Sequence, residues 1–303
     1  MFDESFLVVK VSVVIPVYNG ERYLREALDS VFAQTFRDHE VICVDDGSTD
    51  ASVAIIKEYG ERVTLIQQAN AGQGAARNAG VRRGVSVYVA FLDQDDRWYP
   101  HKLQQQVSAL EADPNAVLAY CNSDRMDDEG RLLQVGATLA ERQSASESSL
   151  GRLIGEGLVL PSTMLVRRAI FECVGGFDPA LRGFEDFDLC ARLKLKGRFV
   201  FLKEPGVCYR VHGEGFQRTG GLRVIQSRAR FLDRMRVLYA GDRIKEALID
   251  AMQAECYSDW GLQELRAGSR ANGRCMLVRS LRCNPLKFRT YSRLFRSLLL
   301  PGR

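Results

Sequence analysis

The sequence predicts an α/β fold with a mostly parallel central sheet, followed by a helical extension. Short β-branched runs alternate with amphipathic stretches through the first part of the chain. Polar residues follow each predicted strand, where ligands bind to parallel sheets. Beyond residue 221 only helical periodicity remains. We therefore expect one domain over residues 1–220 and a basic helical extension over residues 221–303.

The alternation of strand and helix recurs four times. Each pair has an apolar strand, then turn residues, then an amphipathic helix, as parallel crossovers require. The predicted pairs are residues 11–17 with 21–34, residues 41–44 with a helix from about Asp50, residues 63–66 with 74–81, and residues 85–92 with 102–110.

The second half of the chain is less regular. Residues 122–160 are rich in Ser, Gly and charge, which predicts a long loop region with one short helix near 150–154. Regular structure resumes at Pro161. We expect a strand at 164–166, a helix to 174, a helix at 185–196 with Leu189, Leu193 and Leu195 inward, and C-terminal helices at 222–239, 242–260, 262–268, 271–282 and after Pro285.

Composition excludes several classes of protein. The 303 residues are 46% hydrophobic, yet no apolar run approaches the roughly 18 residues of a membrane-spanning helix. The acidic start lacks the positive region of a secretory signal, so we expect a cytoplasmic protein. Eight cysteines without C-x-x-C pairs support neither a disulfide framework nor a zinc site.

Charge is distributed unevenly along the chain. Residues 221–303 contain 17 Lys and Arg against 7 Asp and Glu, whereas residues 1–220 contain 25 against 31. The basic segment suits anionic lipid, nucleic acid or a partner protein, although a solvated helical surface is the more common explanation.

An acidic cluster follows the fourth predicted strand. Asp93, Asp95 and Asp96 lie within four positions at the strand's carboxyl end. Mg²⁺ and Mn²⁺ prefer oxygen ligands and keep positions open for phosphate, so the cluster suits a metal–diphosphate complex. The alternative is an acidic turn before the helix that Pro100 introduces.

Six stretches, taken together, match one family in order. They are VSVVIPVYNGERYLREALDSVFAQTF, EVICVDDGSTD, QQANAGQGAARNAG, VAFLDQDDRWYPHKL, PSTMLVRRAIFECVGGFD and GFEDFDLCARL, followed by YRVHG. On these motifs, over residues 10–213, the chain resembles the inverting family 2 glycosyltransferases, whose fold is the GT-A nucleotide-binding sandwich. The resemblance implies that a sugar passes from a nucleotide donor to a hydroxyl acceptor.

The resemblance also implies nucleotide-binding roles. Pro16 and Tyr18 would wall the base pocket, and Asp46 would accept the imide N–H of uracil. Arg77 would bond a base carbonyl or phosphate, and Asp93 the ribose and diphosphate side. From the residues alone, Pro16 and Tyr18 can simply end the strand, residues 46–50 can form a turn, and Arg77 can be a surface residue.

The resemblance assigns Asp95 to the cation, which we expect to be Mn²⁺ or Mg²⁺. Asp96 would support it or contact the acceptor. His212 matches a position near the metal or diphosphate, and an imidazole suits Mn²⁺ better than Mg²⁺. The alternative for His212 is a polar surface group at a strand end.

The family's catalytic base matches Asp186, the second acid of the Glu185-Asp186 pair. Asp186 would remove the proton of the acceptor hydroxyl, while Glu185 would orient the acceptor or support the loop. We expect the helix N-terminus to lower the pKa of Asp186 and keep it ionised. Complementing the helix dipole is itself a sufficient reason for two acids there.

The resemblance therefore implies metal-assisted, inverting transfer from a nucleotide-diphosphate sugar, with a UDP-sugar expected, in cell-surface polysaccharide or glycan synthesis. Expected partners are the donor and a glycan or lipid-linked acceptor, and no nucleic acid. One alternative is an inactive nucleotide-sugar-binding scaffold. A nucleotidyltransferase is disfavoured because no Gly-rich loop with Lys follows the first strand, and a Rossmann dehydrogenase because Arg77 replaces the third glycine.

The last predicted helix combines basic and apolar residues. Lys287, Arg289, Arg293 and Arg296 alternate with Phe288, Tyr291, Leu294 and Phe295, and the apolar set follows helical spacing. Such a helix can lie on the anionic inner face of a membrane as a peripheral anchor. The alternative is a helix packed against the body with its Arg side chains in water.

Overall fold

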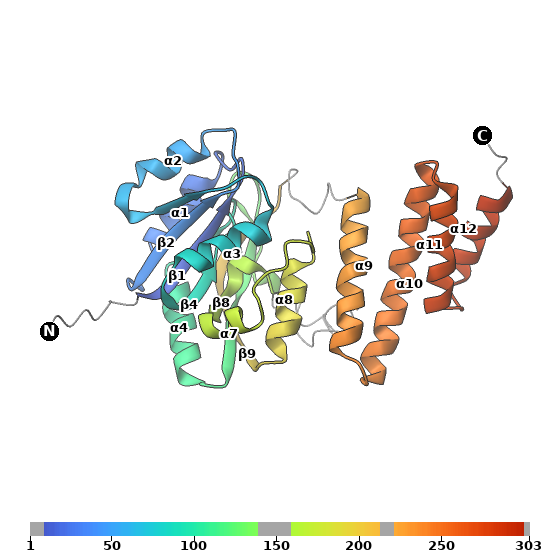
Figure 1. Ribbon diagram of the computed structural model, residues 1–303. Helices are drawn as coiled ribbons and strands as arrows, with labels where there is room; N and C mark the ends of the chain where they lie inside the picture. The colour runs from blue at the N-terminus through green and yellow to red at the C-terminus, as the bar shows by residue number, and fades with distance from the viewer. Residues whose placement is uncertain (1–8, 139–158, 213–220, 300–303) are drawn as a thin grey trace. The chain divides into compact units, whose positions relative to one another are not determined.

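The computed structural model describes residues 9–138, 159–212 and 221–299. The chain divides into two compact units. The α/β unit comprises Met1–Ala145, Glu156–Pro179 and Glu185–Gly213, and the helical unit comprises Ser146–Gly155, Ala180–Phe184 and Glu214–Arg303. Figure 1 shows the sheet of the first unit and the row of helices of the second. The predicted boundary at residue 220 stays a prediction.

One sheet of nine strands forms the centre of the described α/β unit, in the order β3-β2-β1-β4-β8-β6-β9-β5, with β7 beside β6. Its strands are β1 (Val9–Val17), β2 (His39–Asp45), β3 (Thr64–Gln67), β4 (Ser86–Phe91), β5 (Arg97–Trp98), β6 (Ala116–Met126), β7 (Leu132–Gln134), β8 (Met164–Arg167) and β9 (Arg198–Arg210). The strands β1 to β4 pair in parallel, as do β6 and β9, while β8 runs antiparallel between β4 and β6. The carboxyl ends of β1, β2 and β4 therefore meet at one edge.

Helices cover both faces of the sheet. They are α1 (Leu24–Phe32), α2 (Ser52–Glu58), α3 (Gln73–Arg83), α4 (Lys102–Ala112), α7 (Arg168–Cys173) and α8 (Glu185–Lys194), with 3-10 turns η1 (Gly60–Arg62) and η2 (Pro161–Thr163). Residues of α1, α2 and α4 share a core with alternate residues of β1, β2 and β4. On the opposite face the Phe171 and Phe177 rings pack against Phe91 of β4. The sandwich expected from the alternating pattern is present.

The close approach of α3 to the sheet depends on Gly80. A Cβ atom at Gly80 would lie 2.4 Å from Cγ1 of Val14 and 3.2 Å from Cγ2 of Val44. Only glycine lets the helix pack this closely on β1 and β2. Arg77 lies one turn earlier on the same helix, so this contact sets the depth of its side chain.

The prediction of a loop over residues 122–160 was wrong at its start. Strand β6 continues to Met126 and β7 follows at Leu132–Gln134. The polar side chains of this part of β6 are buried because each has a partner. Ser123 bonds Thr138, Asn122 donates to the Lys203 carbonyl, and Asp124 accepts from Tyr99. The helix predicted near 150–154 lies outside the described residues.

The helical unit is a row of helices, α9 (Gly221–Leu238), α10 (Arg243–Arg266), α11 (Arg270–Cys283) and α12 (Phe288–Leu299) (Figure 1). The two helices predicted over 242–268 are one, begun by Asp242, which accepts from the amides of Ile244 and Lys245. Gly261 and Gly273 let α10 and α11 touch, because a Cβ at Gly261 would lie 2.8 Å from the Gly273 carbonyl oxygen. No described helix is both long and apolar enough to cross a membrane.

Other predicted elements are confirmed within a few residues, including α3, α4, α8 and the strands β1 to β4. One side chain was misplaced. Leu195 was expected to pack inward, but it follows the end of α8 and is 55% exposed. Leu189 and Leu193 are fully buried as expected.

The substitution Gly80→Ala tests the contact of α3 with the sheet. Overpacking against Val14 costs about 1–3 kcal/mol, of which helix propensity returns up to about 1 kcal/mol. We therefore expect a net loss of stability, measured by urea unfolding. Arg82→Ala, on the exposed side of the same helix, should change the free energy of unfolding by less than about 0.5 kcal/mol. Equal stability of the two variants would contradict the packing argument.

Candidate active site

A buried arginine joins the acidic loop after β4 to the first turn of α8. Arg77 on α3 is 1% exposed, and its guanidinium donates to Asp93 Oδ1 at 2.6 Å and to Asp186 Oδ1 at 3.5 Å. Asp93 follows β4, and Asp186 lies in the first turn of α8. The guanidinium also lies 5.2 Å from the centre of the Phe177 ring. Three residues predicted from separate motifs are thus brought together.

These contacts keep Arg77 charged. Burial alone would lower its pKa, but Asp93, Asp186 and Glu185 outweigh burial and raise it. Arg77 also donates to Gln73 Oε1 at 3.3 Å. A buried guanidinium is stable only when carboxylates compensate it, so the three acids and the arginine depend on one another.

The pKa of Asp186 differs from expectation. Burial, partly offset by Arg77 and reinforced by the charges of Glu185 and Asp93, raises it to about 8. The prediction that the helix N-terminus would lower it was wrong, because desolvation and two nearby acids outweigh the dipole. The side chain is still 30% exposed, so its carboxyl can reach a ligand. A carboxyl group with this pKa is a stronger base than an ordinary Asp.

Glu185 is placed differently from its neighbour. It is 8% exposed, and its Oε2 atom is buried with no hydrogen-bond partner among the described residues. Its Cβ atom lies near Gly74 of α3, where an added Cβ would be at 3.9 Å. An unsatisfied buried carboxylate oxygen is costly and marks a position where a ligand hydroxyl can donate.

A second pair joins Asp95 and His212. His212 Nε2 lies 2.9 Å from Asp95 Oδ2, and Asp95 remains 30% exposed. The two residues come from the loop after β4 and the segment after β9. A carboxylate and an imidazole fit a divalent cation of the Mn²⁺ type. Within the described ranges no group of three or more His, Cys, Asp or Glu is placed to hold a metal. A cation bound by this pair would need further ligands, such as the diphosphate oxygens of a nucleotide sugar, to complete its coordination.

Asp96 anchors the loop after β4 to Ser162 and to the end of β9. It is 2% exposed, accepts from Ser162 Oγ at 2.6 Å and from the Arg210 amide at 3.0 Å. Ser162 Oγ in turn accepts from the Asp93 amide at 3.0 Å. Burial, with Asp95 and Asp93 nearby, raises the pKa of Asp96. This geometry lets Asp96 support the loop that carries Asp95; contact with the acceptor stays a prediction.

Arg210 holds the same loop from the other side. It is buried, donates to the Asp95 carbonyl at 2.9 Å and to Glu26 Oε2 at 2.9 Å, and lies 4.3 Å from the Tyr23 ring centre. Sequence reasoning missed both Arg210 and Ser162. The available signal was their position inside the matched motifs YRVHG and PST.

Asp46 directly follows β2 and has backbone partners. Its carboxylate accepts from the amides of Ala71 and Gly72, both at 2.8 Å, and from Gln68 Nε2 at 2.7 Å. It therefore shapes the loop that leads into α3. Its Oδ1 atom already accepts two of these bonds, whereas Oδ2 accepts one and keeps acceptor capacity for a further donor, as binding of a base would require.

Pro16 and Tyr18 lie at the end of β1. Pro16 is buried and opposite Val44, while Tyr18 is 49% exposed. The Gln94 side chain bonds both the amide and the carbonyl of Tyr18, at 2.8 and 3.0 Å. Gln94, which the sequence reasoning passed over, thus ties the acidic loop to the first strand end.

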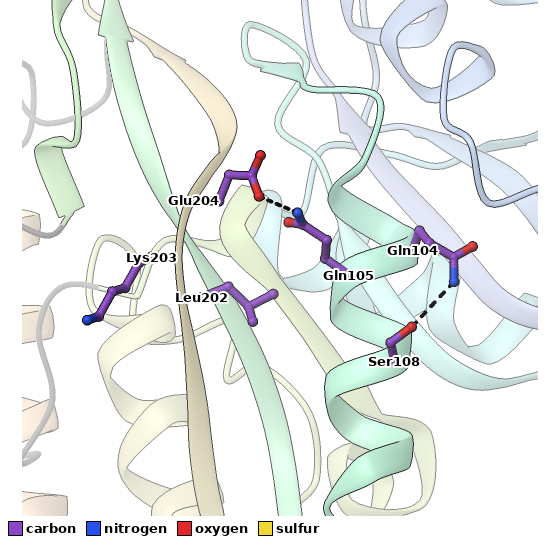
Figure 2. Close-up of a pocket in the computed structure, with 6 residues that line it drawn as sticks. All are labelled: Gln104, Gln105, Ser108, Leu202, Lys203 and Glu204. Carbon is purple, nitrogen blue, oxygen red and sulfur yellow. Dashed lines mark hydrogen bonds between the residues drawn. The ribbon is translucent and has the colours of Figure 1, made fainter.

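A cavity lies elsewhere in the α/β unit, away from the acidic loop after β4. It encloses about 490 Å³ between α4 and β9 and is lined by Gln104, Gln105, Ser108, Leu202, Lys203 and Glu204 (Figure 2). Gln105 donates to Glu204, and Gln104 to Ser108, so its polar groups bond one another. None of its lining residues lies in the loop after β4 or in the first turn of α8.

The family model for Glycosyl transferase family 2 matches residues 12–175. The chain belongs to this family. An uncharacterized glycosyltransferase of Rickettsia prowazekii is 33% identical over 204 residues, which are 67% of this chain and 64% of that protein. One of Nostoc is 36% identical over 212 residues, 68% of this chain and 66% of that protein. The chain thus matches less than two thirds of the Rickettsia relative.

Solved structures show the same GT-A fold. TarS of Staphylococcus aureus, crystallised with UDP-GlcNAc, has a TM-score of 0.71 at 18% identity, covering 95% of this chain and 89% of that one. A mannosyltransferase of Pyrobaculum calidifontis, in complex with GDP-Man and Mn²⁺, has a TM-score of 0.62 at 18% identity, covering 96% and 85%. The fold expected from the motifs is confirmed.

The substitution Ser162→Ala tests how the acidic loop is held. It leaves buried Asp96 and the Asp93 amide each short of a partner, and such losses cost about 1–3 kcal/mol. We expect unfolding free energy to fall by that amount in urea titrations. The control Ser108→Ala removes an exposed hydroxyl bonded only to Gln104 and should leave stability unchanged. A Ser162→Ala protein as stable as the control would show that the loop does not depend on this hydroxyl.

Proposed function

We propose that the protein is an inverting glycosyltransferase that moves a sugar from a nucleotide-diphosphate donor to a hydroxyl acceptor. The observation that carries the proposal is the buried Arg77, which holds Asp93 and Asp186 on either side of one guanidinium. This arrangement places Asp93, at a strand end where nucleotide donors bind, beside Asp186, whose raised pKa suits a general base.

In the proposed reaction Asp186 accepts the proton of the acceptor hydroxyl. The oxygen attacks the anomeric carbon, the bond between that carbon and the diphosphate breaks, and the nucleoside diphosphate leaves with the electron pair. Single displacement of this kind inverts the anomeric centre. Glu185, whose buried Oε2 lacks a partner, would accept a hydrogen bond from the acceptor and orient it.

The donor site is proposed at the ends of β1, β2 and β4. Pro16, Tyr18 and Asp46 would contact the base, and Asp93 the ribose and diphosphate side. Arg77 is paired with acids here, so we assign it to positioning Asp93 and Asp186 and keep direct nucleotide contact as the alternative. The UDP-GlcNAc of TarS supports a UDP-sugar, and the GDP-Man of the mannosyltransferase keeps a guanine nucleotide open.

Asp95 and His212 would hold a divalent cation, Mn²⁺ or Mg²⁺. When bound, such a cation stabilises the negative charge that develops on a departing diphosphate. The Mn²⁺ in the mannosyltransferase structure supports this assignment. We propose a glycan or lipid-linked acceptor in cell-surface polysaccharide synthesis, which suits the anionic membrane face discussed below for α12.

Nucleoside diphosphate release tests the proposal. The purified protein is incubated with UDP-, GDP- and dTDP-sugars, with and without Mn²⁺ or Mg²⁺, and slow transfer to water is followed. We expect release from one donor, dependent on metal. Asp186→Asn should lower the rate by about 10²- to 10⁴-fold, the usual contribution of a general base.

The matched control is Asp38→Asn, an exposed acid before the amino end of β2, opposite the strand end that carries Asp46. Its rate should equal that of the unmodified protein. Release of pyrophosphate would instead indicate a nucleotidyltransferase. Binding of a donor without turnover under any condition would support the scaffold alternative and overturn the proposal.

The raised pKa of Asp186 predicts the dependence of rate on pH. A base acts only when deprotonated, and with a pKa of about 8 it is mostly protonated below that pH. The rate should therefore rise with pH and level off above about 8. Because the Glu185 charge raises the pKa of Asp186, Glu185→Gln should move the midpoint to lower pH.

The unmodified protein and Glu185→Gln are compared by the midpoint of the pH–rate profile, which does not depend on how much activity the variant keeps. Glu172→Gln, which removes an exposed acid on α7, should leave the midpoint in place. A midpoint unmoved by Glu185→Gln, or one near the ordinary Asp value of about 4, would contradict the role of Asp186.

A further inference from the structure

Helix α12 is packed with its polar side inward. Thr290 is fully buried and Ser297 is 2% exposed. Four large apolar side chains point to solvent, with Phe288 at 76%, Tyr291 at 47%, Phe295 at 62% and Leu298 at 58% exposure, whereas Leu294 is half-buried. A helix that packs on a protein body normally buries its apolar face, so this orientation is the reverse of the usual one.

Hydrogen bonds explain why the polar side faces inward. Thr290 Oγ1 bonds Ser258 Oγ at 3.0 Å on α10 and Ser280 Oγ at 3.3 Å on α11. Arg293 donates to Ser258 Oγ at 2.8 Å and to Asp259 at 3.1 Å. Every buried hydroxyl of this polar seam has a partner, so turning the helix over would leave these groups unsatisfied.

The exposed apolar residues form one continuous stripe. Residues 288, 291, 295 and 298 recur at intervals of three and four, which places them on one side of the helix. Leu286, in the turn before the helix, is 76% exposed. A stripe of this kind is far more than the scattered apolar residues of an ordinary surface.

Positive charge lies beside the stripe. Residues 265–303 contain ten Lys and Arg and no Asp or Glu. Arg289 and Arg296 are exposed, each directly after a stripe phenylalanine, and neither is paired with an acid in the described part of the chain. The ligand for this surface must therefore combine an apolar layer with negative charge.

We infer that α12 docks the protein on an anionic phospholipid surface, with the stripe in the acyl boundary and Arg289 and Arg296 at the headgroups. Phospholipid supplies both required layers, and aromatic side chains favour the interface. A second copy of the chain fits less well, because it would set arginines against arginines. Nucleic acid supplies the negative charge but no apolar layer in which Leu298 could be buried.

Vesicle co-sedimentation of the full chain tests this inference. We expect binding to vesicles of phosphatidylcholine mixed with phosphatidylglycerol, and little to phosphatidylcholine alone. Replacing both stripe phenylalanines, Phe288→Ser with Phe295→Ser, should lower the partition coefficient at least about tenfold. Arg289→Gln with Arg296→Gln should lower it on the order of twentyfold, and high salt should weaken binding similarly.

Matched controls exist in the same unit. Val237 and Ile244 are 80% and 76% exposed on α9 and α10, and changing both to Ser should leave binding intact. Arg230→Gln with Arg243→Gln removes two exposed charges outside α12 and should have a small effect. Asp186→Asn should bind as the unmodified protein does, so failure of docking is distinct from failure of the proposed transfer.

Several results would overturn the inference. These are equal binding to both vesicle types, no binding to either, or equal losses in the stripe and control variants. Concentration-dependent dimerisation in analytical ultracentrifugation that the phenylalanine variant abolishes, without vesicle binding, would assign the stripe to a second copy. Binding of a single-stranded oligonucleotide in place of vesicles would assign it to nucleic acid.

Discussion

The pairing of one buried cation with the acids around it is the constraint on which the site depends. Without Arg77, Asp93, Glu185 and Asp186 would repel one another in a poorly hydrated place, and without the acids the guanidinium would be an unpaired buried charge. The pairing also connects α3, the end of β4 and the start of α8. Gly80 contributes by letting α3 lie against Val14, which sets how far Arg77 reaches.

Hydrogen bonds from several parts of the fold hold the acidic loop. Asp96 is fixed by Ser162 and Arg210, Gln94 is fixed on Tyr18, and Asp95 keeps 30% of its side chain exposed. Preorganised groups need little rearrangement when charge develops on a substrate, which is a principal source of catalytic power. The supporting residues are thus as necessary to the geometry as those that would touch substrate.

Local periodicity and the strand-end rule predicted the α/β sandwich and placed Asp46, Asp93 and Asp95 at one edge of the sheet. They failed where partners far along the chain decide the outcome. The polar end of β6 is buried because Tyr99, Thr138 and Lys203 satisfy it. The pKa of Asp186 rises because of Asp93 and Glu185, which local helix reasoning cannot weigh. Ser162 and Arg210 carry no chemical signature by themselves.

The polar seam between α12 and the helices α10 and α11 also affects how readily α12 separates from them. None of its described apolar side chains is buried, so lifting α12 from α10 and α11 uncovers hydroxyls that water satisfies readily. The hydrophobic effect, which makes separation of most helices costly, offers little resistance here. We therefore expect α12 to open more readily than α10 and α11, which pack closely at Gly261 and Gly273.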